Sequence, residues 1–338
     1  MSNQTPEVTP ELFFNTVTAY QRTGALKGAI ELDVFTAISE GNQTVSSLAQ
    51  RCSASERGMR ILCDYLVTID FLTKEADRYG LTPDAAMFLV KHSPGYMGSA
   101  VEFLVSQTMV DGFKDVAAAV RKGGTTIPDT GTVAPDHPVW VNFAKAMAPL
   151  MAVPGQLMAQ LVDGDASKPL KVLDIAAGHG LFGIAIAKRN PHAQIVAVDW
   201  SGVLELAKEN AQEGGVGDRY STIPGSAFDV DWGTGYDLAL LTNFLHHFDV
   251  ATCETLLKKI HAAIAPDGRV VTLEQVPNSD RVTPPEAARF SLVMLTTTPH
   301  GDAYTFAEYE QMFSNAGFAR SELHPLPPSL AQVVISYK

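Results

Sequence analysis

The segment from Lys171 to Gly183 restricts the fold more than any other part of the chain. A strand-length apolar run leads into a turn of small residues, and an apolar helical pattern begins at Phe182. Similar apolar runs alternate with helical segments over the C-terminal half, at residues 171–176, 195–198, 238–242 and 269–273. This alternation is typical of a parallel sheet with crossover helices. We therefore expect an α/β domain over residues 166–338.

The turn in this segment has the features of a ligand-binding loop. Ala176, Gly178 and Gly180 let the backbone approach a ligand, and we expect free N–H groups at the helix start to face it. Asp199 closes the next apolar run, where a carboxylate can accept both ribose hydroxyl protons. Asp174, before the turn, would repel a pyrophosphate but suits a ligand with an ammonium and a sulfonium. The pattern therefore indicates S-adenosylmethionine (SAM) rather than NAD.

The first hundred residues predict a domain of another kind. Three short helical segments, the last two with polar starts at Thr44 and Ser55, precede two short strands at residues 71–74 and 78–82. This order is that of a winged helix. The chain has 37 acidic and 25 basic residues and a net charge of −12, which disfavours a nucleic-acid partner. We expect residues 1–105 to form a structural or dimerising domain.

Residues 106–165 connect the two predicted domains. Glycine, threonine, proline and aspartate are frequent in residues 121–138, which predicts a surface loop, and a helix is expected over Val139–Leu161. No apolar run approaches the roughly 20 residues of a membrane span, and the N-terminus lacks the pattern of a secretory signal. The three cysteines are scattered and form no paired motif. These features predict a cytoplasmic protein with no membrane partner.

Over roughly residues 10–338 the chain resembles the two-domain small-molecule O-methyltransferases of plants and bacteria. The resemblance implies a Rossmann-like domain that binds SAM, a winged-helix dimerisation domain, a small-molecule acceptor and a homodimer. Relatives carry an aspartate where this chain has Ser226. The family's cofactor motifs fall on Asp174, Ala176, Gly178 and Gly180 at the methionine end, on Asp199 and Trp200 at the ribose and adenosine, on Ser226, Ala227 and Phe228 around the adenine, and on Asn243.

The resemblance places the general base on His246 and the carboxylate that orients it on Glu274. A second orienting acid is expected where the chain has Ala303, with Asp302 beside it. A phenol has a pKa of about 10, so a nearby imidazole can take its proton as the oxygen attacks. We expect His247 to pack structurally, because neighbouring residues of an extended chain face opposite sides. Glu274→Gln is expected to be milder than loss of His246, since an amide keeps a hydrogen-bond acceptor.

Five side chains are candidates for the wall of an acceptor pocket: Phe143, Met147, Phe290, Met294 and Thr298. They would form an apolar cavity suited to an aromatic or polyketide-like acceptor. The spacing of the histidines and acids demands no metal site. The alternatives are a C- or N-methyltransferase, with or without a metal, a DNA-binding regulator that senses a metabolite, and a degenerate member that binds the cofactor but transfers no methyl group. The alternative for His246 itself is a structural role.

Overall fold

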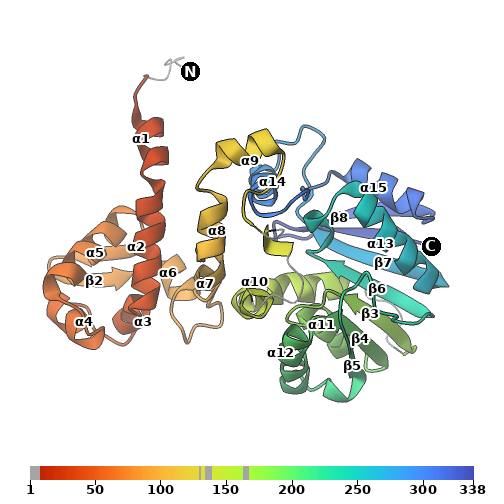
Figure 1. The fold of residues 1–338 in the computed structure, drawn as a ribbon. Coiled ribbons are helices and arrows are strands. Elements are labelled where there is room, and N and C mark those ends of the chain that lie inside the picture. The colour runs from red at the N-terminus through yellow and green to blue at the C-terminus, as the bar shows by residue number, and fades with distance from the viewer. Residues whose placement is uncertain (1–7, 129–130, 134–138, 163–166) are drawn as a thin grey trace, which may run out of the picture. The chain divides into compact units, whose positions relative to one another are not determined.

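The computed structural model describes residues 8–128, 131–133, 139–162 and 167–338. The chain divides into two compact units, which meet in sequence between Val101 and Glu102. Figure 1 shows their elements. The second unit contains the predicted sheet and the whole segment, residues 106–165, that we expected to connect two domains.

The N-terminal unit is helical, with a two-stranded wing. Its elements are α1 (Glu11–Val17), α2 (Ala19–Glu31), α3 (Val34–Ser39), α4 (Val45–Arg51), α5 (Glu56–Thr68), β1 (Leu72–Glu75), β2 (Arg78–Leu81) and α6 (Pro83–Phe88). The two strands pair antiparallel, with Leu72 opposite Leu81. Helices α3, α4 and α5 followed by this hairpin give the predicted winged-helix order.

The expected helix starts in this unit are confirmed by their caps. Thr44 and Ser47 form a reciprocal capping box at α4, and the Ser55 side chain accepts a hydrogen bond from Gly58 N at α5. The apolar pattern of residues 26–38 is divided between α2 and α3 at Asp33, whose φ is 60°. Apolar side chains of both helices still join one core, which includes Ala29, Val34, Phe35, Leu48, Met59 and Leu66.

A seven-stranded sheet forms the centre of the C-terminal unit. Its strands are β3 (Leu170–Ile175), β4 (Ala193–Asp199), β5 (Tyr220–Pro224), β6 (Tyr236–Thr242), β7 (Ile264–Glu274), β8 (Arg320–Pro325) and β9 (Gln332–Tyr337). They lie in the order β5-β4-β3-β6-β7-β9-β8, and β9 runs antiparallel to its neighbours β7 and β8 while the other pairs are parallel. The predicted Rossmann-like α/β class is confirmed.

Helices cover both faces of this sheet (Figure 1). Met158 and Phe182, from α10 and α11, belong to the core on one face. Leu257 and Phe313, from α13 and α15, belong to the core on the other face. The helices after residue 99 are α7 (Ala100–Leu104), α8 (Gln107–Gly112), α9 (Val116–Lys122), α10 (Val139–Leu161), α11 (Leu181–Arg189), α12 (Ser201–Glu213), α13 (Val250–Ala263), α14 (Pro285–Thr297) and α15 (Phe306–Asn315), with short 3₁₀ turns η1 (Gly131–Val133), η2 (Gly217–Arg219) and η3 (Leu245–His247).

The strand order reverses between β3 and β6. From β3 the chain proceeds outward through β4 and β5, and it then returns to β6 on the other side of β3. Ligands of open α/β sheets bind outside the carboxyl ends of the strands at such a reversal. The turn after β3 and the residue after β6, Asn243, are therefore at the place where a ligand is expected.

The prediction that residues 121–138 form a surface loop is wrong for Thr125 and Thr132, which pack on the end of α14. Thr125 and Thr132 are buried, and their hydroxyls donate to Thr296 O at 2.7 Å and to Thr297 O at 3.1 Å. These carbonyls lie in the last turn of α14, where intrahelical partners run out. Residues 129–130 and 134–138 of the predicted loop lie outside the described residues.

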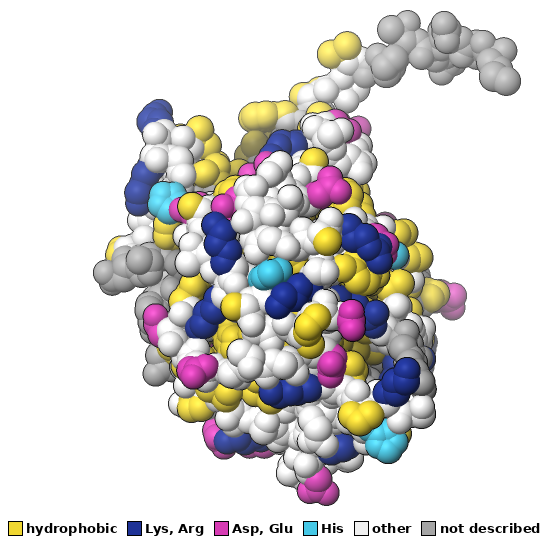
Figure 2. All heavy atoms as spheres, turned by 90° about the vertical axis from the view of Figure 1, so that its right-hand side faces the viewer, with side chains coloured by type: hydrophobic (Ala, Val, Ile, Leu, Met, Phe, Trp, Pro, Cys, Tyr) yellow, Lys and Arg dark blue, Asp and Glu magenta, His cyan; other side chains and the backbone are white. Residues whose placement is uncertain are grey.

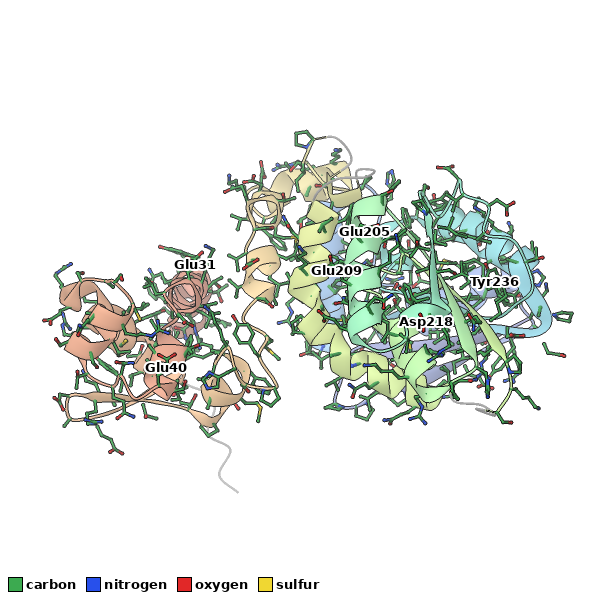
Figure 3. All side chains as sticks on the ribbon, turned by 90° about the horizontal axis from the view of Figure 1, so that it is seen from below. Glu31, Glu40, Glu205, Glu209, Asp218 and Tyr236 are labelled. Carbon is green, nitrogen blue, oxygen red and sulfur yellow. The ribbon has the colours of Figure 1, made fainter. Side chains whose placement is uncertain are left out.

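Charged side chains of both signs are mixed on the face shown in Figure 2. On α12 the exposed acids Glu205 and Glu209 stand one turn apart (Figure 3). No helix within the described ranges is both long enough and apolar enough to cross a bilayer.

Candidate active site

Four strand ends bring the predicted site residues to one edge of the sheet. Strand β3 leads into the turn at residues 176–180, β4 ends at Asp199, β6 leads into Asn243, and β7 ends at Glu274. These strands are neighbours in the order β4-β3-β6-β7 and run parallel, so their carboxyl ends lie side by side. Residues far apart in sequence therefore share this edge.

The turn after β3 needs small residues for conformational reasons. Ala176, Gly178 and Gly180 have φ values of 53°, 57° and 75°, in the left-handed region that disfavours larger side chains. A Cβ atom on Gly180 would lie 2.7 Å from the Tyr220 hydroxyl. Gly178 N donates to Asp199 Oδ2 at 2.8 Å. This bond fixes the turn against the acid that closes β4.

The start of α11 differs from the expectation that its free N–H groups face a ligand. Leu181 N donates to His179 Nδ1 at 3.2 Å, and Gly183 N donates to Asp174 Oδ2 at 3.1 Å. Burial lowers the pKa of His179 to about 4, so its Nδ1 remains an acceptor at neutral pH. Two N–H groups that the sequence assigns to a bound molecule therefore have partners inside the protein.

Asp174 is fully buried next to this turn. Burial raises the pKa of its carboxyl well above the usual range, although the hydrogen bond from Gly183 N opposes the shift. Its Oδ1 has no hydrogen-bond partner among the residues that the structure describes. A buried acceptor without a partner is unfavourable, and a cationic group nearby would favour the ionised carboxylate. Asp174 therefore fits a ligand that carries an ammonium group.

Asp199 is anchored through both carboxylate oxygens. Oδ2 accepts the bond from Gly178 N, and Oδ1 accepts one from Trp200 N at 2.7 Å. Burial raises its pKa to about 6, and the two backbone donors limit the rise. A carboxylate has about four lone-pair positions, so two remain for the hydroxyls of a ribose. Trp200 itself is partly exposed and is the N-cap residue of α12.

The loop after β5 is tied to the same strand end. Gly225 N donates to Asp199 O at 2.9 Å, and the φ of Gly225 is 132°. The Ser226 hydroxyl accepts a hydrogen bond from Phe228 N at 3.2 Å, which closes a small turn around Ala227. The Ser226 hydrogen is still available for donation, so the side chain can serve as donor where relatives carry an acid.

Glu274 holds His246 in one orientation. Its Oε2 lies 2.5 Å from His246 Nδ1, and both side chains are buried. Its Oε1 accepts hydrogen bonds from Phe244 N at 2.9 Å and from Leu245 N at 3.0 Å, so the backbone fixes the carboxylate. A carboxylate accepts hydrogen bonds and does not donate them, so His246 Nδ1 carries the hydrogen and Nε2 keeps its lone pair. His246 can therefore accept a proton at Nε2.

His247 packs among aromatic rings. Its ring centroid lies 5.7 Å from that of Trp140, 6.5 Å from that of Phe244 and 4.2 Å from that of His246. Its Nδ1 is buried and has no hydrogen-bond partner within the described part of the chain. Burial, and to a smaller degree His246, lower the pKa of His247 well below its usual range. The ring is therefore neutral at neutral pH, and its contacts are those of a packing residue.

The second orienting acid expected near Ala303 does not pair with His246. Ala303 is fully buried. Asp302 Oδ1 accepts a hydrogen bond from Ala303 N at 2.8 Å, and its Oδ2 lies 3.4 Å from the Arg281 guanidinium. Glu274 is thus the acid that contacts the histidine. In the described ranges, no group of three or more His, Cys, Asp or Glu side chains is arranged to hold a metal ion.

Two expected pocket residues belong to aromatic contacts near the histidines. The Phe290 ring stands perpendicular to that of His246 with centroids 4.8 Å apart. Phe143 packs edge-on against Trp140 at 5.8 Å, and Trp140 in turn contacts His247. Trp140 and Phe143 lie on α10 and Phe290 on α14, and ring contacts connect all three to the two histidines.

Two other expected pocket residues are part of the interior. Met294 and Thr298 are buried. The Thr298 hydroxyl donates to Met294 O at 2.7 Å and accepts a hydrogen bond from Gly301 N at 2.8 Å. Thr298 therefore stabilises the turn at the end of α14, and its place in a pocket wall stays a prediction.

Sequence reasoning missed two residues at this edge. Phe103 packs against Phe143 with centroids 4.7 Å apart, and it lies in a run of short helices that gave no clear signal. Met151 Sδ lies 3.6 Å from Asn243 Nδ2. Met151 follows Phe143 and Met147 at steps of four along α10, where Met147 is partly exposed, so the helical period could have identified it.

Two family models and several known proteins match most of the chain. The O-methyltransferase dimerisation domain matches residues 14–91, and the O-methyltransferase domain matches residues 113–319. The 3-hydroxy-5-methyl-1-naphthoate 3-O-methyltransferase of Streptomyces sahachiroi is 28% identical over 91% of this chain and 89% of that protein. A crystal structure from Nostoc punctiforme PCC 73102, described as a candidate O-methyltransferase, is 63% identical with a TM-score of 0.95 and covers 98% of this chain and 100% of that one. Human N-acetylserotonin methyltransferase, solved with SAM, shares the fold at 22% identity, with a TM-score of 0.85 over 100% of this chain and 99% of that one.

Proposed function

Because this chain belongs to the family of SAM-dependent O-methyltransferases, we propose that it methylates a hydroxyl of a small aromatic or polyketide-like metabolite with His246 as general base. The observation that carries the proposal is the buried His246–Glu274 pair at the same sheet edge as the turn after β3. When bound, SAM supplies a methyl group activated by its positive sulfonium.

The residues along the sheet edge would hold SAM from one end to the other. Asp174 and the turn at residues 176–180 would take the amino acid end, and Asp199 the ribose hydroxyls. Trp200 and Ser226–Phe228 would lie at the adenosine. Asn243, at the switch point of the sheet, would complete the site. Alignment of the two reactants contributes much of the rate in such a transfer.

His246 would supply a place for the hydroxyl proton. A phenol with a pKa of about 10 is mostly protonated at neutral pH. As the acceptor oxygen attacks, its proton would pass to His246 Nε2. Glu274 would stabilise the imidazolium that forms and keep the ring in position, because its own oxygens are fixed by backbone N–H groups.

The aromatic rings near His246 support a planar acceptor. Phe290 contacts His246 directly, and Phe103, Phe143 and Trp140 form a series of edge-on contacts that ends at His247. Aromatic side chains favour stacked or edge-on contacts with other rings. The Streptomyces relative is named for a hydroxyl on a fused aromatic acid. We therefore propose a hydroxylated fused-ring acceptor.

Incubation with isotope-labelled SAM and a panel of hydroxynaphthoic acids tests this function. The labelled methyl group should appear in NMR spectra as an aromatic methyl ether. A label on carbon or nitrogen would instead support the alternative methyltransferase classes, which the absence of an acid at Ala303 also suggests. Tight SAM binding without transfer to any acceptor of the panel would contradict the proposed acceptor class.

Asp199→Ala should weaken SAM binding by about 1.5–3 kcal/mol, the range for a hydrogen bond to a charged group. The ribose needs the ionised carboxylate as acceptor, and the pKa of Asp199 is about 6. The Kd for SAM of the unchanged protein should therefore rise as the pH falls below about 6, and this rise should disappear in the variant. Calorimetry above and below that pH measures both effects.

The matched control for this change is Asp218→Ala. Asp218 is an exposed acid on η2 of the same unit (Figure 3). Its loss should change neither the SAM affinity nor the pH dependence. An unaltered affinity in folded Asp199→Ala protein would remove Asp199 from the site.

We also expect a two-fold homodimer joined through the N-terminal unit. Leu12, Phe13, Phe14 and Val17 of α1 are each more than half exposed, and contiguous apolar surface of this kind usually marks an interaction site. The dimerisation-domain match supports this assembly. Sedimentation at micromolar concentration should give the mass of two chains, and Leu12→Glu combined with Phe13→Glu should shift it toward one. A stable monomer of the unchanged chain would count against the dimer.

A cytoplasmic location and a role in secondary metabolism are part of the proposal. Cys52, Cys63 and Cys253 are free thiols, which suits a reducing compartment. The Streptomyces relative is named for a substituted naphthoate, and we propose a metabolite of that class for this chain.

A further inference from the structure

The side chain of Lys259, on α13, is hydrogen-bonded to the loop after β5. Its Nζ donates to Ala227 O at 3.0 Å, to Phe228 O at 3.0 Å and to Val230 O at 2.7 Å. An ammonium group has three donors, so all of them are used within one short loop. The side chain is partly buried, and burial lowers the pKa of Lys259 while nearby aspartates oppose the shift.

An aromatic ring completes the environment of this ammonium group. Nζ lies 4.0 Å from the centroid of the Trp232 ring, and Trp232 is buried at the end of the same loop. A cation over an aromatic face is stabilised by the ring quadrupole. The lysine therefore fixes both the middle of the loop and the residue that closes it.

The rest of the loop depends on this arrangement. Gly225 N is bound to Asp199 O, and Asp229 N and Val230 N both donate to Ser226 O at 3.0 Å. The carbonyls of residues 227, 228 and 230 consequently converge on one point, where loss of the ammonium would leave them without a strong donor. Buried or half-buried carbonyls without donors are unfavourable, so the loop would rearrange if the ammonium were removed.

We propose that Lys259 is a positioning residue for SAM, which preorganises residues 225–230 to receive the adenine. The inference rests on the proposed function, because it is there that Ser226–Phe228 is assigned to the adenosine. Lys259 would not touch the ligand. With Lys259 in place, the loop is already ordered before SAM binds. Without it, the loop would lose conformational entropy on binding, and ordering one residue is enough to weaken binding about tenfold.

The test compares Lys259→Met with Lys258→Met by calorimetry. Met keeps much of the apolar length and removes the charge and donors. Lys258 is the exposed neighbour on α13, with a Glu254 carboxylate 3.9 Å away, and a surface pair of this kind contributes little. The probes are SAM and 5′-deoxy-5′-methylthioadenosine, which keeps the adenine and ribose and lacks the amino acid end. Thermal unfolding of each variant is recorded separately.

Lys259→Met should raise the Kd values of both probes by about the same factor, near tenfold, and Lys258→Met should change neither Kd. An unchanged affinity in folded Lys259→Met protein would overturn the inference, as would a loss confined to SAM, because the lysine acts at the adenine end. A purely structural lysine would lower the unfolding temperature and leave both Kd values unchanged. If the Met variant does not fold, Lys259→Gln takes its place with the same criteria.

Failure of the proposed function is visible in the same experiment. If the unchanged chain binds neither probe, the proposed function falls and this inference falls with it. If the unchanged chain binds both probes and Lys259→Met binds them equally well, this inference alone is wrong.

Discussion

His246→Ala should lower kcat by about 10²–10⁴-fold, the usual contribution of a positioned acid–base group, and leave the Kd for SAM almost unchanged. The structure supports this separation because the His246 ring pairs with Glu274 and Phe290, whereas all the expected SAM contacts except Asn243 lie at β3, β4 and β5. Steady-state kinetics with a hydroxynaphthoic acceptor and calorimetry with SAM measure the two quantities.

Two other histidines serve as controls for this prediction. His300 is exposed in the loop after α14, and His300→Ala should leave kcat and stability unchanged. His247→Ala should lower stability because its ring packs among Trp140, Phe244 and His246, with a smaller effect on kcat. Equal losses of activity in the His246 and His247 variants, together with lost SAM binding, would show that the pair is structural.

Glu274→Gln should lower kcat by about 10²–10⁴-fold, nearly as much as loss of the histidine. The sequence alone predicted a milder effect on kcat, and the geometry of the Glu274 carboxylate predicts a larger one. Oε1 of Glu274 accepts two backbone N–H groups, so the amide oxygen of the substituted side chain must take that place. The amide nitrogen then faces His246 Nδ1 and donates to it. The hydrogen on the imidazole would move to Nε2, where it blocks removal of the acceptor proton.

The tautomer change gives Glu274→Gln a spectroscopic signature. Nitrogen NMR of the histidine ring should show the hydrogen on Nδ1 in the unchanged protein and on Nε2 in the variant. The Kd for SAM should stay nearly constant. A kcat within a few-fold of the unchanged protein would show that Glu274 does not control the orientation of His246.

Strand ends made much of the site predictable from the sequence. Asp199, Asn243 and Glu274 each follow or close an apolar run of strand length, Asp174 lies one residue before the end of β3, and parallel strands bring such positions to one edge. The small residues of the turn were also visible in the sequence, whereas the left-handed φ values of Gly178 and Gly180 come from the structure. Spacing along the sequence indicated Asp174 and Asp199, whereas the family resemblance indicated Asn243 and Glu274.

Contacts between distant segments were not predictable in this way. Thr125 and Thr132 look like loop residues in sequence, yet their hydroxyls bind carbonyls of α14. His179 accepts a hydrogen bond from a backbone N–H at the start of α11 that we expected from the sequence to face a ligand. Phe103 and Lys259 act through partners that no local pattern connects to them. The orientation of Glu274 depends on two backbone donors, and it reversed an expectation drawn from side-chain chemistry alone.

The most direct test of His246 as general base compares two acceptors that differ in ionisation. One is a hydroxynaphthoic acid, and the other carries a ring nitro group that ionises the same hydroxyl at neutral pH. His246→Ala should lose about 10²–10⁴-fold in the single-turnover rate with the first acceptor and far less with the second, whose proton is already gone. An equal loss with both acceptors would contradict a role for His246 in proton removal.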